Sequence, residues 1–282
     1  MQRQGKYPVP EGASPVPGLE IAGFIEEAGE ECTRFNKDDC VFGLIPGGGY
    51  AEYAVIHKDM AMPIPENFSV EEAAAIPEVF LTAWQGLTWL GNLTERERVL
   101  IHAGASGVGT AAIQLARQMN AEVLVTTSGA KHNKCLELGA AYAINYQQED
   151  FAERVQALTN EEGVDVILDF VGAPYLKRNV DSLRMDGRLV VLAFMGGAKA
   201  EELNIAKLLV KRLSIIGSTL RSRPLDYQIQ LTGELANFAL PKFRDGSLRP
   251  VIDSVFPLSQ AADAHAHMEA NRNVGKIILR VA

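Results

Sequence analysis

The sequence predicts an α/β fold built on a doubly wound parallel sheet. Apolar runs alternate with amphipathic segments, a glycine-rich turn joins one run directly to a helix, and both chain ends have a different, β-like pattern. Strands separated by helical crossovers pair in parallel and are covered on both faces, which explains why each run is mostly apolar. The six predicted strands are residues 99–103, 122–126, 143–146, 164–169, 188–193 and 213–217.

The first 65 residues are rich in glycine and proline and contain short alternating stretches at residues 20–27 and 50–56. Turn signals separate these stretches, which favours irregular antiparallel β structure. Residues 69–90 then show helical spacing, and Ser69 followed by Glu72 is a capping-box pattern. We therefore expect a helix that links the first region to the parallel sheet.

The C-terminal tail departs from the regular alternation. It contains a β-like run at residues 251–256, a helical segment at residues 258–270 and a closing strand at residues 276–281. No internal repeat interrupts the pattern. This tail is assigned to the same domain as the N-terminal region, on the resemblance described below.

Composition and charge disfavour several classes of protein. The 282 residues carry 27 Lys and Arg against 35 Asp and Glu, a net charge of −8, so no nucleic-acid partner is expected. Cys32, Cys40 and Cys135 are widely spaced, which favours a reducing cytoplasm over a disulfide framework. No apolar run is long enough to cross a bilayer, so we expect a soluble protein with no membrane partner.

The most specific local signal is residues 101–116, where an apolar strand enters a turn of small residues and then a helix. Glycines let the backbone approach a pyrophosphate closely, and the helix N-terminus offers amide donors to the phosphates. Ser106 stands at the middle glycine of the usual pattern, and the alternative is an ordinary tight turn of a parallel sheet. The residues expected to hold the cofactor here are Gly104, Ser106, Gly107, Val108 and Gly109.

The next strand end predicts which cofactor binds. NAD-dependent enzymes place a carboxylate there for the ribose 2′-hydroxyl, whereas this chain has Ser128 and Lys131 and no carboxylate at residues 126–132. A hydroxyl and a cation suit a 2′-phosphate, so the sequence favours NADPH. The alternative is that Lys131 only solvates the first turn of the following helix.

Several segments occur together in the order typical of one family: residues 17–20, 76–78, 81–83, 103–109, 164–172 and 275–279. On these motifs the chain resembles the medium-chain dehydrogenase/reductase family, within it the zinc-free quinone-oxidoreductase or zeta-crystallin branch. The resemblance implies a GroES-like catalytic domain (1–77 and 241–282), a Rossmann NADPH-binding domain (78–240) and a homodimer. Because members of this branch begin well before the position of Met1, it also implies a partial, N-terminally truncated GroES-like domain.

The resemblance also assigns site residues. Tyr7 is the candidate substrate-pocket phenol, with a surface turn residue beside Pro8 as the other interpretation. Thr82 matches the residue that lies against the nicotinamide in relatives, and the alternative is a helix hydroxyl bonded to its own backbone. The remaining positions follow strand carboxyl ends, where an open parallel sheet binds its ligand. They are Asn145 or Tyr146, Phe170, Val171, Gly172, Phe194, Met195, Gly196, Ser218, Thr219 and Leu220.

Two positions depart from related patterns. Leu19 stands where zinc alcohol dehydrogenases have a histidine, and the scattered cysteines and histidines lack zinc-ligand spacing, so no catalytic metal is expected. Asp38 stands where the family usually has glycine, which predicts strain if that turn requires a positive φ.

These observations favour NADPH-dependent hydride transfer to quinones or related electrophilic carbonyl compounds, without a metal. Reduction of the double bond of enals, enones or enoyl thioesters requires the same hydride geometry and stays open as an alternative. A third hypothesis is an NADPH-binding sensor or structural protein, a use of this fold that crystallin relatives illustrate.

Overall fold

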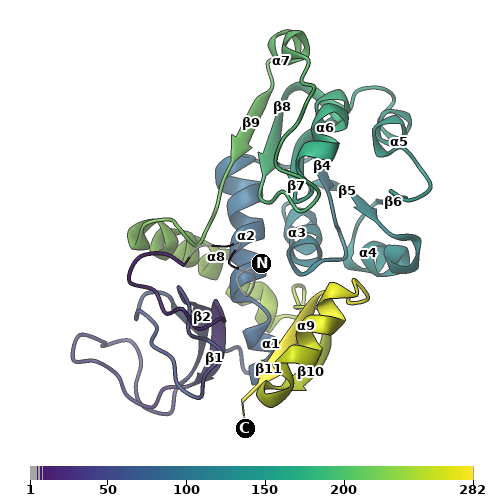
Figure 1. The fold of residues 1–282 in the computed structure, drawn as a ribbon. Helices are drawn as coiled ribbons and strands as arrows, with labels where there is room; N and C mark the ends of the chain where they lie inside the picture. Colours follow the sequence, from purple (N-terminus) through teal and green to yellow (C-terminus); the bar gives the residue numbers. More distant parts are fainter. Residues whose placement is uncertain (1–4, 6, 8, 282) are drawn as a thin grey trace. The chain divides into compact units, whose positions relative to one another are not determined.

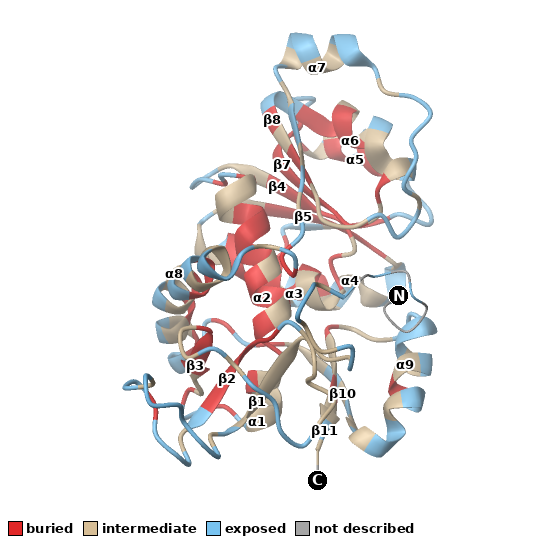
Figure 2. Cartoon of the chain, turned by 60° about the vertical axis from the view of Figure 1, so that its left-hand side comes forward, coloured by how far each residue is buried: buried red, intermediate tan, exposed pale blue. Residues whose placement is uncertain are grey.

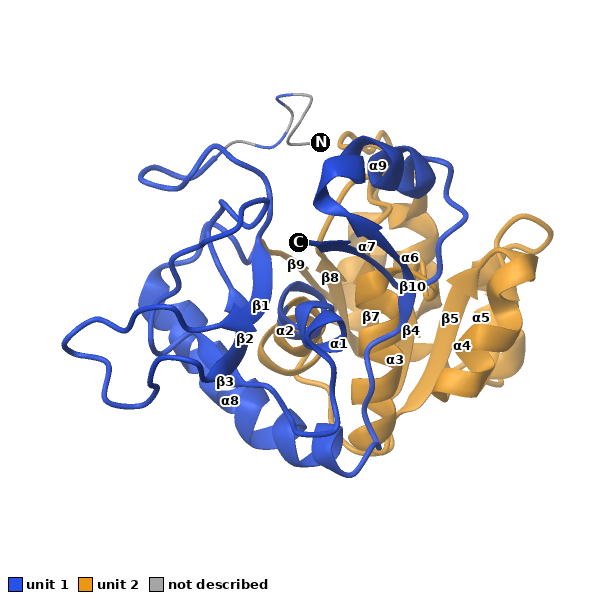
Figure 3. Cartoon of the chain, turned by 90° about the horizontal axis from the view of Figure 1, so that it is seen from below, with its two compact units in different colours: residues 1–81, 220–282 blue, residues 82–219 orange. Residues whose placement is uncertain are grey.

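The computed structural model describes residue 5, residue 7 and residues 9–281, and it divides into two compact units. Unit 1 comprises residues 1–81 and 220–282, and unit 2 comprises residues 82–219. Figure 1 shows the elements along the chain, and Figure 3 shows each unit in its own colour. The boundary falls inside α2 (Pro77–Trp84). The domain limits expected from the sequence remain a prediction.

Unit 2 contains a six-stranded sheet with the order β6-β5-β4-β7-β8-β9, in which every neighbouring pair is parallel. This confirms the predicted doubly wound α/β sheet. The strands are β4 (Arg98–Ile101), β5 (Glu122–Thr127), β6 (Tyr142–Asn145), β7 (Val164–Asp169), β8 (Leu183–Val191) and β9 (Ser214–Gly217).

The strand order reverses between β4 and β7, because the chain builds outward to β6 and then returns to the other side of β4. Right-handed crossovers in the two directions place their helices on opposite faces of the sheet. The helices are α3 (Gly107–Gln118), α4 (His132–Leu138), α5 (Phe151–Leu158), α6 (Leu176–Ser182) and α7 (Ile205–Lys211), with short turns η3 (Gly129–Lys131) and η4 (Ala173–Tyr175). The π-helical η2 (Gln85–Leu90) continues α2.

The core of unit 2 lies along the central strands, which Figure 2 colours almost entirely as buried. All six residues of β7 are buried, as are three of the four residues of β4. Leu100, Leu124, Ile167 and Leu189 come from four adjacent strands and form one apolar cluster. A strand that is covered on both faces needs an unbroken apolar run. The sheet could therefore be predicted from the sequence.

Unit 1 combines two small sheets with helices. An antiparallel sheet has the order β1-β2-β3, and β10 and β11 form a separate parallel pair. Phe243 packs edge-on against Phe80, with ring centroids 5.1 Å apart. The elements are β1 (Glu20–Phe24), β2 (Cys40–Leu44), β3 (Ala61–Pro63), α1 (Val70–Ala74), the first part of α2, α8 (Leu225–Arg244), β10 (Ile252–Pro257), η5 (Leu258–Gln260), α9 (Ala261–Glu269) and β11 (Lys276–Arg280).

One predicted β segment of unit 1 is wrong. Residues 50–56 do not form a strand, although their polar and apolar residues alternate. Tyr53 and Val55 are 74% and 91% exposed, and no described strand pairs with the segment. Alternation alone does not make a strand, because the backbone also needs a paired neighbour.

The predicted linking helix begins as expected. Ser69 caps α1, its Oγ accepts from the Glu72 N–H at 3.2 Å, and the Glu72 carboxylate accepts from the Ser69 N–H at 2.9 Å. The helix is interrupted before Pro77, which disfavours helical backbone at Ile76 and lacks an N–H of its own. None of the described helices combines the length and apolar character that crossing a membrane requires.

Candidate active site

The glycine-rich turn of unit 2 joins β4 to α3. Ser106 is the N-cap of α3, and its Oγ accepts from the Gly109 N–H at 3.0 Å. A Cβ on Gly104 would lie 2.7 Å from the Cβ of Val125, and one on Gly109 would lie 2.4 Å from the carbonyl oxygen of Ala103. Both positions therefore require glycine. Gly107 and Val108 form the first turn, where amides have no intrahelical acceptor and point toward any anion at the helix end.

The end of β5 adds a second group of candidate residues. Ser128 is the N-cap of η3, and its hydroxyl makes no capping bond; Lys131 ends this short turn. A Cβ on Gly129 would lie 3.0 Å from the Nδ2 of Asn145, so the end of β6 lies directly beside η3. Tyr146, the residue after β6, is 39% exposed. The two strand ends thus place a hydroxyl, a cation and a phenol at one edge of the sheet.

The turns after β7 and β8 form a third group. The Met195 N–H donates to Phe170 O at 3.1 Å, and the Gly196 N–H donates to Val171 O at 2.9 Å. Gly172, at φ 85°, forms an isolated bridge with Gly197. The two turns are therefore joined by backbone contacts. Their predicted cofactor residues, Val171, Phe194, Met195 and Gly196, lie side by side.

A buried polar network holds the backbone of the turn that follows β7. Asp169, 1% exposed, accepts from the N–H groups of Val171 and Gly172 at 2.7 and 3.1 Å. It also accepts from the Nδ2 of Asn179 in α6 at 3.0 Å. His102 directly follows β4, and its Nε2 lies 2.7 Å from the Oδ1 of Asn179. The network therefore connects the ends of two neighbouring strands, β4 and β7, with α6.

Burial controls the charge of this network. It lowers the pKa of His102 to about 4, with the nearby Arg178 acting in the same direction and the Asn179 contact opposing both. Burial also raises the pKa of Asp169, while the hydrogen bonds from Val171, Gly172 and Asn179 oppose that shift. His102 lies within the motif at residues 101–116 but had no assigned role, and Asn179 belongs to no motif. Asp169 stood within the quoted segment 164–172 without an assigned role.

In unit 1, Tyr7 lies against charged groups that the sequence analysis did not single out. The Arg221 guanidinium carbon is 5.2 Å from the centroid of the Tyr7 ring. Tyr7 is 36% exposed, and burial and the charge of Glu78 raise the pKa of its phenol, with Arg221 acting in the opposite direction. Glu78 belongs to the quoted motif at residues 76–78, and Arg221 directly follows a predicted cofactor residue. Their positions in or beside these segments were the signal by which the sequence could have pointed to Glu78 and Arg221.

The other predicted residues are distributed between the units. Thr82 is a partly buried residue of α2 and the first residue of unit 2. Ser218 follows β9, and its N–H donates to Val191 O at 3.2 Å. Leu220, 6% exposed, is the first residue of the second segment of unit 1. Their roles toward a cofactor or substrate remain predictions.

The structure shows the backbone at the two positions that depart from related patterns, Asp38 and Leu19. Asp38 adopts φ 71°, so the turn does require the left-handed backbone that glycine favours. Leu19 contributes its carbonyl, which accepts from the Ile45 N–H at 2.7 Å. Within the described residues, no group of three or more His, Cys, Asp or Glu side chains is arranged to hold a metal ion.

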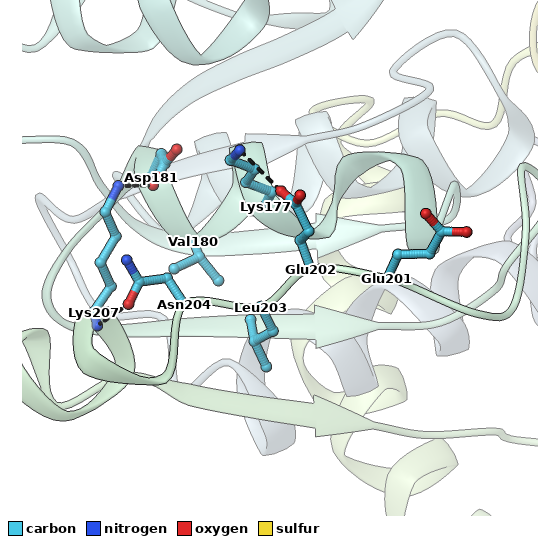
Figure 4. A pocket seen from close by; sticks show the side chains of 8 residues that line it. All are labelled: Lys177, Val180, Asp181, Glu201, Glu202, Leu203, Asn204 and Lys207. Carbon is cyan, nitrogen blue, oxygen red and sulfur yellow. Dashed lines mark hydrogen bonds and ion pairs between the residues drawn. The ribbon is translucent and has the colours of Figure 1, made fainter.

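A polar pocket of unit 2 contains none of the predicted site residues. It is lined by α6, α7 and the segment before α7, and Figure 4 shows two pairs of oppositely charged side chains facing each other. Lys177 pairs with Glu202 at 3.2 Å, and Lys207 pairs with Asp181. These two ion pairs occupy both lysines of the pocket, and none of its lining residues belongs to the predicted site.

Two family models match the N-terminal region and the centre of the chain. A model described as alcohol dehydrogenase GroES-like domain matches residues 1–66, and one described as zinc-binding dehydrogenase matches residues 107–236. The quinone oxidoreductase of Sus scrofa is 34% identical over 266 residues, which cover 93% of this chain and 79% of the relative.

Some relatives are much longer. The synaptic vesicle membrane protein VAT-1 homolog of Danio rerio is 31% identical over 293 residues, which cover 99% of this chain and 60% of the relative. A polyketide synthase subunit of Mycobacterium tuberculosis is also 31% identical, and 13% of its length is covered. The chain thus spans less than two thirds of these relatives.

Solved structures agree on the fold. A quinone oxidoreductase of Pseudomonas syringae has a TM-score of 0.86 at 30% identity, covering 98% of this chain and 85% of that one. The CurK enoyl reductase has a TM-score of 0.81 at 30% identity, covering 95% and 80%. A mycobacterial protein complexed with NADPH has a TM-score of 0.83 at 25% identity, covering 93% and 81%.

Proposed function

Because the chain belongs to the medium-chain dehydrogenase/reductase family of oxidoreductases, we propose that it uses NADPH to reduce quinones or related electrophilic carbonyl compounds. The observation that supports this most directly is the nucleotide edge of unit 2. There the capped N-terminus of α3, the end of β5 and the joined turns after β7 and β8 all follow strand carboxyl ends. The similarity to two quinone oxidoreductases supports the choice of acceptor.

The choice of NADPH over NADH rests on the end of β5. Ser128 has a hydroxyl without a capping partner, and Lys131 brings a cation within the same short turn. These groups suit a 2′-phosphate, which is dianionic or nearly so at neutral pH, and no carboxylate stands there to repel it. The solved relative in complex with NADPH supports the same choice.

In the proposed reaction, bound nicotinamide supplies a hydride, and the chain positions the reactants. The amides of Gly107 and Val108 would bind the pyrophosphate, and Gly104 and Gly109 would let it approach the backbone. Thr82 would contact the nicotinamide, and Tyr7 would donate a hydrogen bond to the acceptor oxygen. No metal takes part in this proposal, and a homodimer in a reducing cytoplasm is the expected state.

A second candidate is reduction of a carbon–carbon double bond in enals, enones or enoyl thioesters. The similarity to the CurK enoyl reductase favours it. Both reactions create negative charge on an acceptor oxygen after hydride addition, as a hydroquinone anion in one case and an enolate in the other. They differ in the shape of the acceptor, so a substrate panel separates them.

The test begins with fluorescence titration of the chain with NADPH and NADH. 9,10-Phenanthrenequinone, trans-2-hexenal and crotonyl-CoA are then added separately while cofactor oxidation is followed at 340 nm. Tighter NADPH binding with quinone turnover is the expected result. Turnover of the enal or thioester alone would support the second candidate. Tight NADPH binding with no turnover in the panel would favour the non-catalytic sensor.

A further inference from the structure

A group of charged side chains lies inside unit 1, apart from the residues that the sequence analysis assigned. Lys276 of β11 forms an ion pair with Glu20 of β1, and both side chains are less than 20% exposed. The second oxygen of Glu20 accepts from the Glu78 N–H at 2.9 Å, at the beginning of α2. The ion pair therefore anchors the start of α2. The Glu78 carboxylate itself has no hydrogen-bond partner among the described residues.

Arg221 is the second cation of this group and is 8% exposed. Its Nε and Nη2 both donate to Pro46 O, at 3.0 and 2.9 Å. Its third nitrogen, Nη1, is buried and has no hydrogen-bond partner among the described residues. A buried donor without an acceptor destabilises the folded chain, and the cost is larger when the group is charged, so this nitrogen calls for an explanation. One explanation is a ligand that supplies the missing acceptor.

The surroundings of Arg221 fit an oxygen atom that carries negative charge. The guanidinium is held rigidly by its two bonds to Pro46 O, so Nη1 is preorganised and needs no rearrangement of its own side chain. The Tyr7 ring lies over one face of the guanidinium, with its centroid 5.2 Å from the guanidinium carbon. Tyr7 is also the predicted substrate-pocket phenol, so a cation and a phenol would act on the same atom.

We propose that Arg221 is a substrate-binding residue, whose Nη1 donates to the acceptor oxygen that becomes negatively charged when hydride is added. The inference rests on the proposed function and extends it. The acceptor gains two electrons and one proton equivalent with the hydride, and solvent supplies the second proton. Arg221 stabilises the anion that exists between these steps. The class of substrate is thus a compound with a conjugated carbonyl, and not an isolated alkene.

Glu78 makes this stabilisation depend on pH. Burial, followed by the negative charge of Glu20, raises the pKa of Glu78 to about 7, while Lys276 and Arg221 oppose the shift. Below pH 7 the carboxyl is neutral and leaves the charge of Arg221 available to the acceptor. Above pH 7 the carboxylate offsets part of that charge. The charged or titratable groups that face Glu78 are Glu20, Lys276, Arg221 and Tyr7.

The experiment compares Arg221→Met and Arg221→Lys with the wild-type chain, using NADPH and 9,10-phenanthrenequinone. For Arg221→Met we expect kcat/KM for the quinone to fall about 10- to 100-fold while the NADPH Kd changes less than twofold. Lysine keeps the positive charge but lacks the paired donors of the guanidinium, so we expect a kcat/KM between those of the wild type and Arg221→Met. Arg223→Met is the matched control, because Arg223 lies on the same segment with its guanidinium over Tyr227, and less than twofold change is expected.

Two further measurements separate binding from a structural role at the Pro46 turn. Guanidinium ion at low millimolar concentration should restore turnover of Arg221→Ala saturably, which a collapsed turn would not permit. In the wild type, the KM for the quinone should rise about three- to tenfold from pH 6 to pH 8.5. In Glu78→Gln, which leaves Arg221 in place, that rise should disappear.

The outcomes are distinct. If the wild-type chain reduces no carbonyl acceptor, the proposed function fails and this inference fails with it. If the wild type is active but Arg221→Met keeps its kcat/KM, the inference alone is overturned. An equal loss of NADPH affinity and quinone turnover, without rescue by guanidinium, would also overturn it, because that pattern indicates a structural arginine. If the arginine variants do not fold, an unchanged pH profile in Glu78→Gln still decides against the proposal.

Discussion

The amide oxygen of Asn179 lies 2.7 Å from the Nε2 of His102, and this contact determines the tautomer of the imidazole. Asn179 donates through its Nδ2 to the carboxylate of Asp169, which only accepts, so its Oδ1 faces the ring. The proton of the neutral ring is therefore on Nε2. Nδ1 then accepts from the hydroxyl of Thr126, 2.9 Å away.

The first prediction concerns acid stability. Because the folded-state pKa of His102 is lowered to about 4 from 6.5, the unfolded chain binds more protons between these values. The resulting contribution to the free energy of unfolding is complete above pH 6.5 and should fall by about 2 kcal/mol by pH 5. Urea unfolding at both pH values measures it, with His102→Asn as the variant that lacks this component. Nitrogen NMR showing a protonated ring at pH 6 would contradict the assignment.

The second prediction separates the two aspartates of β7. Asp169→Asn weakens the bonds to the Val171 and Gly172 amides, and we expect a five- to tenfold weaker NADPH Kd with about 1.5–3 kcal/mol less stability. Asp165, at the other end of the strand, accepts from the Arg98 N–H at 2.8 Å. Asp165→Asn should lose comparable stability and keep its NADPH Kd. Equal Kd values in the two variants would show that Asp169 does not position the turn.

The third prediction tests cofactor preference. Lys131→Gln removes the cation at the end of β5, and the ratio of NADH Kd to NADPH Kd should fall about tenfold, or ~1.4 kcal/mol. The control is Lys134→Gln, whose lysine pairs with Glu137 at 3.2 Å on α4. Isothermal titration with both cofactors measures the ratios. An unchanged ratio in Lys131→Gln would leave the lysine as a solvating residue only.

The fourth prediction concerns Glu78 and alkaline conditions. Its folded-state pKa of about 7 lies above the ordinary value of 4.5 for a glutamate, so the folded chain binds more protons between these values and its stability falls as the pH rises from 4.5 to 7. Glu78→Gln removes this penalty and should be more stable than the wild type by about 3 kcal/mol at pH 8 and by less than about 1 kcal/mol at pH 5. Thermal unfolding at both pH values gives the comparison. Equal differences at both would show that Glu78 does not titrate in this range.

The fifth prediction follows from the backbone of Asp38. A residue other than glycine at φ 71° pays a conformational cost, so Asp38→Gly should raise the free energy of unfolding by about 0.5–1 kcal/mol. Asp38→Ala keeps the cost and should give no gain. Differential scanning calorimetry on the three proteins distinguishes these results. A lower Tm for the glycine variant than for the alanine variant would contradict the prediction.

The sheet of unit 2 could be predicted because its signal is local. Each strand is an apolar run that needs no knowledge of its partners, and the turn at Gly104–Gly109 has its own pattern. The strand predicted at residues 50–56 was wrong because alternation is a local signal, whereas a strand also needs a partner that local sequence does not reveal. Expectations carried by the family resemblance covered the roles of Tyr7 and Thr82, which remain untested.

The charged groups could not be predicted in the same way. Glu20 and Lys276 pair across 256 positions of the chain, and Arg221 reaches Pro46 across 175. His102, Asn179 and Asp169 meet because the ends of two neighbouring strands and one helix come together in the fold, and no spacing in the sequence predicts that contact. Burial is a property of the folded chain, and it is burial that shifts the pKa values of Glu78 and His102.

At the joined turns after β7 and β8, some positions tolerate substitution and others do not. A Cβ on Gly172 would lie 2.7 Å from the carbonyl oxygen of Gly197, so the backbone there accepts no other residue. Phe194 and Met195 extend from the same frame with 57% and 66% of their surfaces exposed. Substitutions at these two positions alter the local shape without disturbing the frame. Divergence of ligand preference among related chains, and its redesign in the laboratory, would therefore concentrate on Phe194 and Met195.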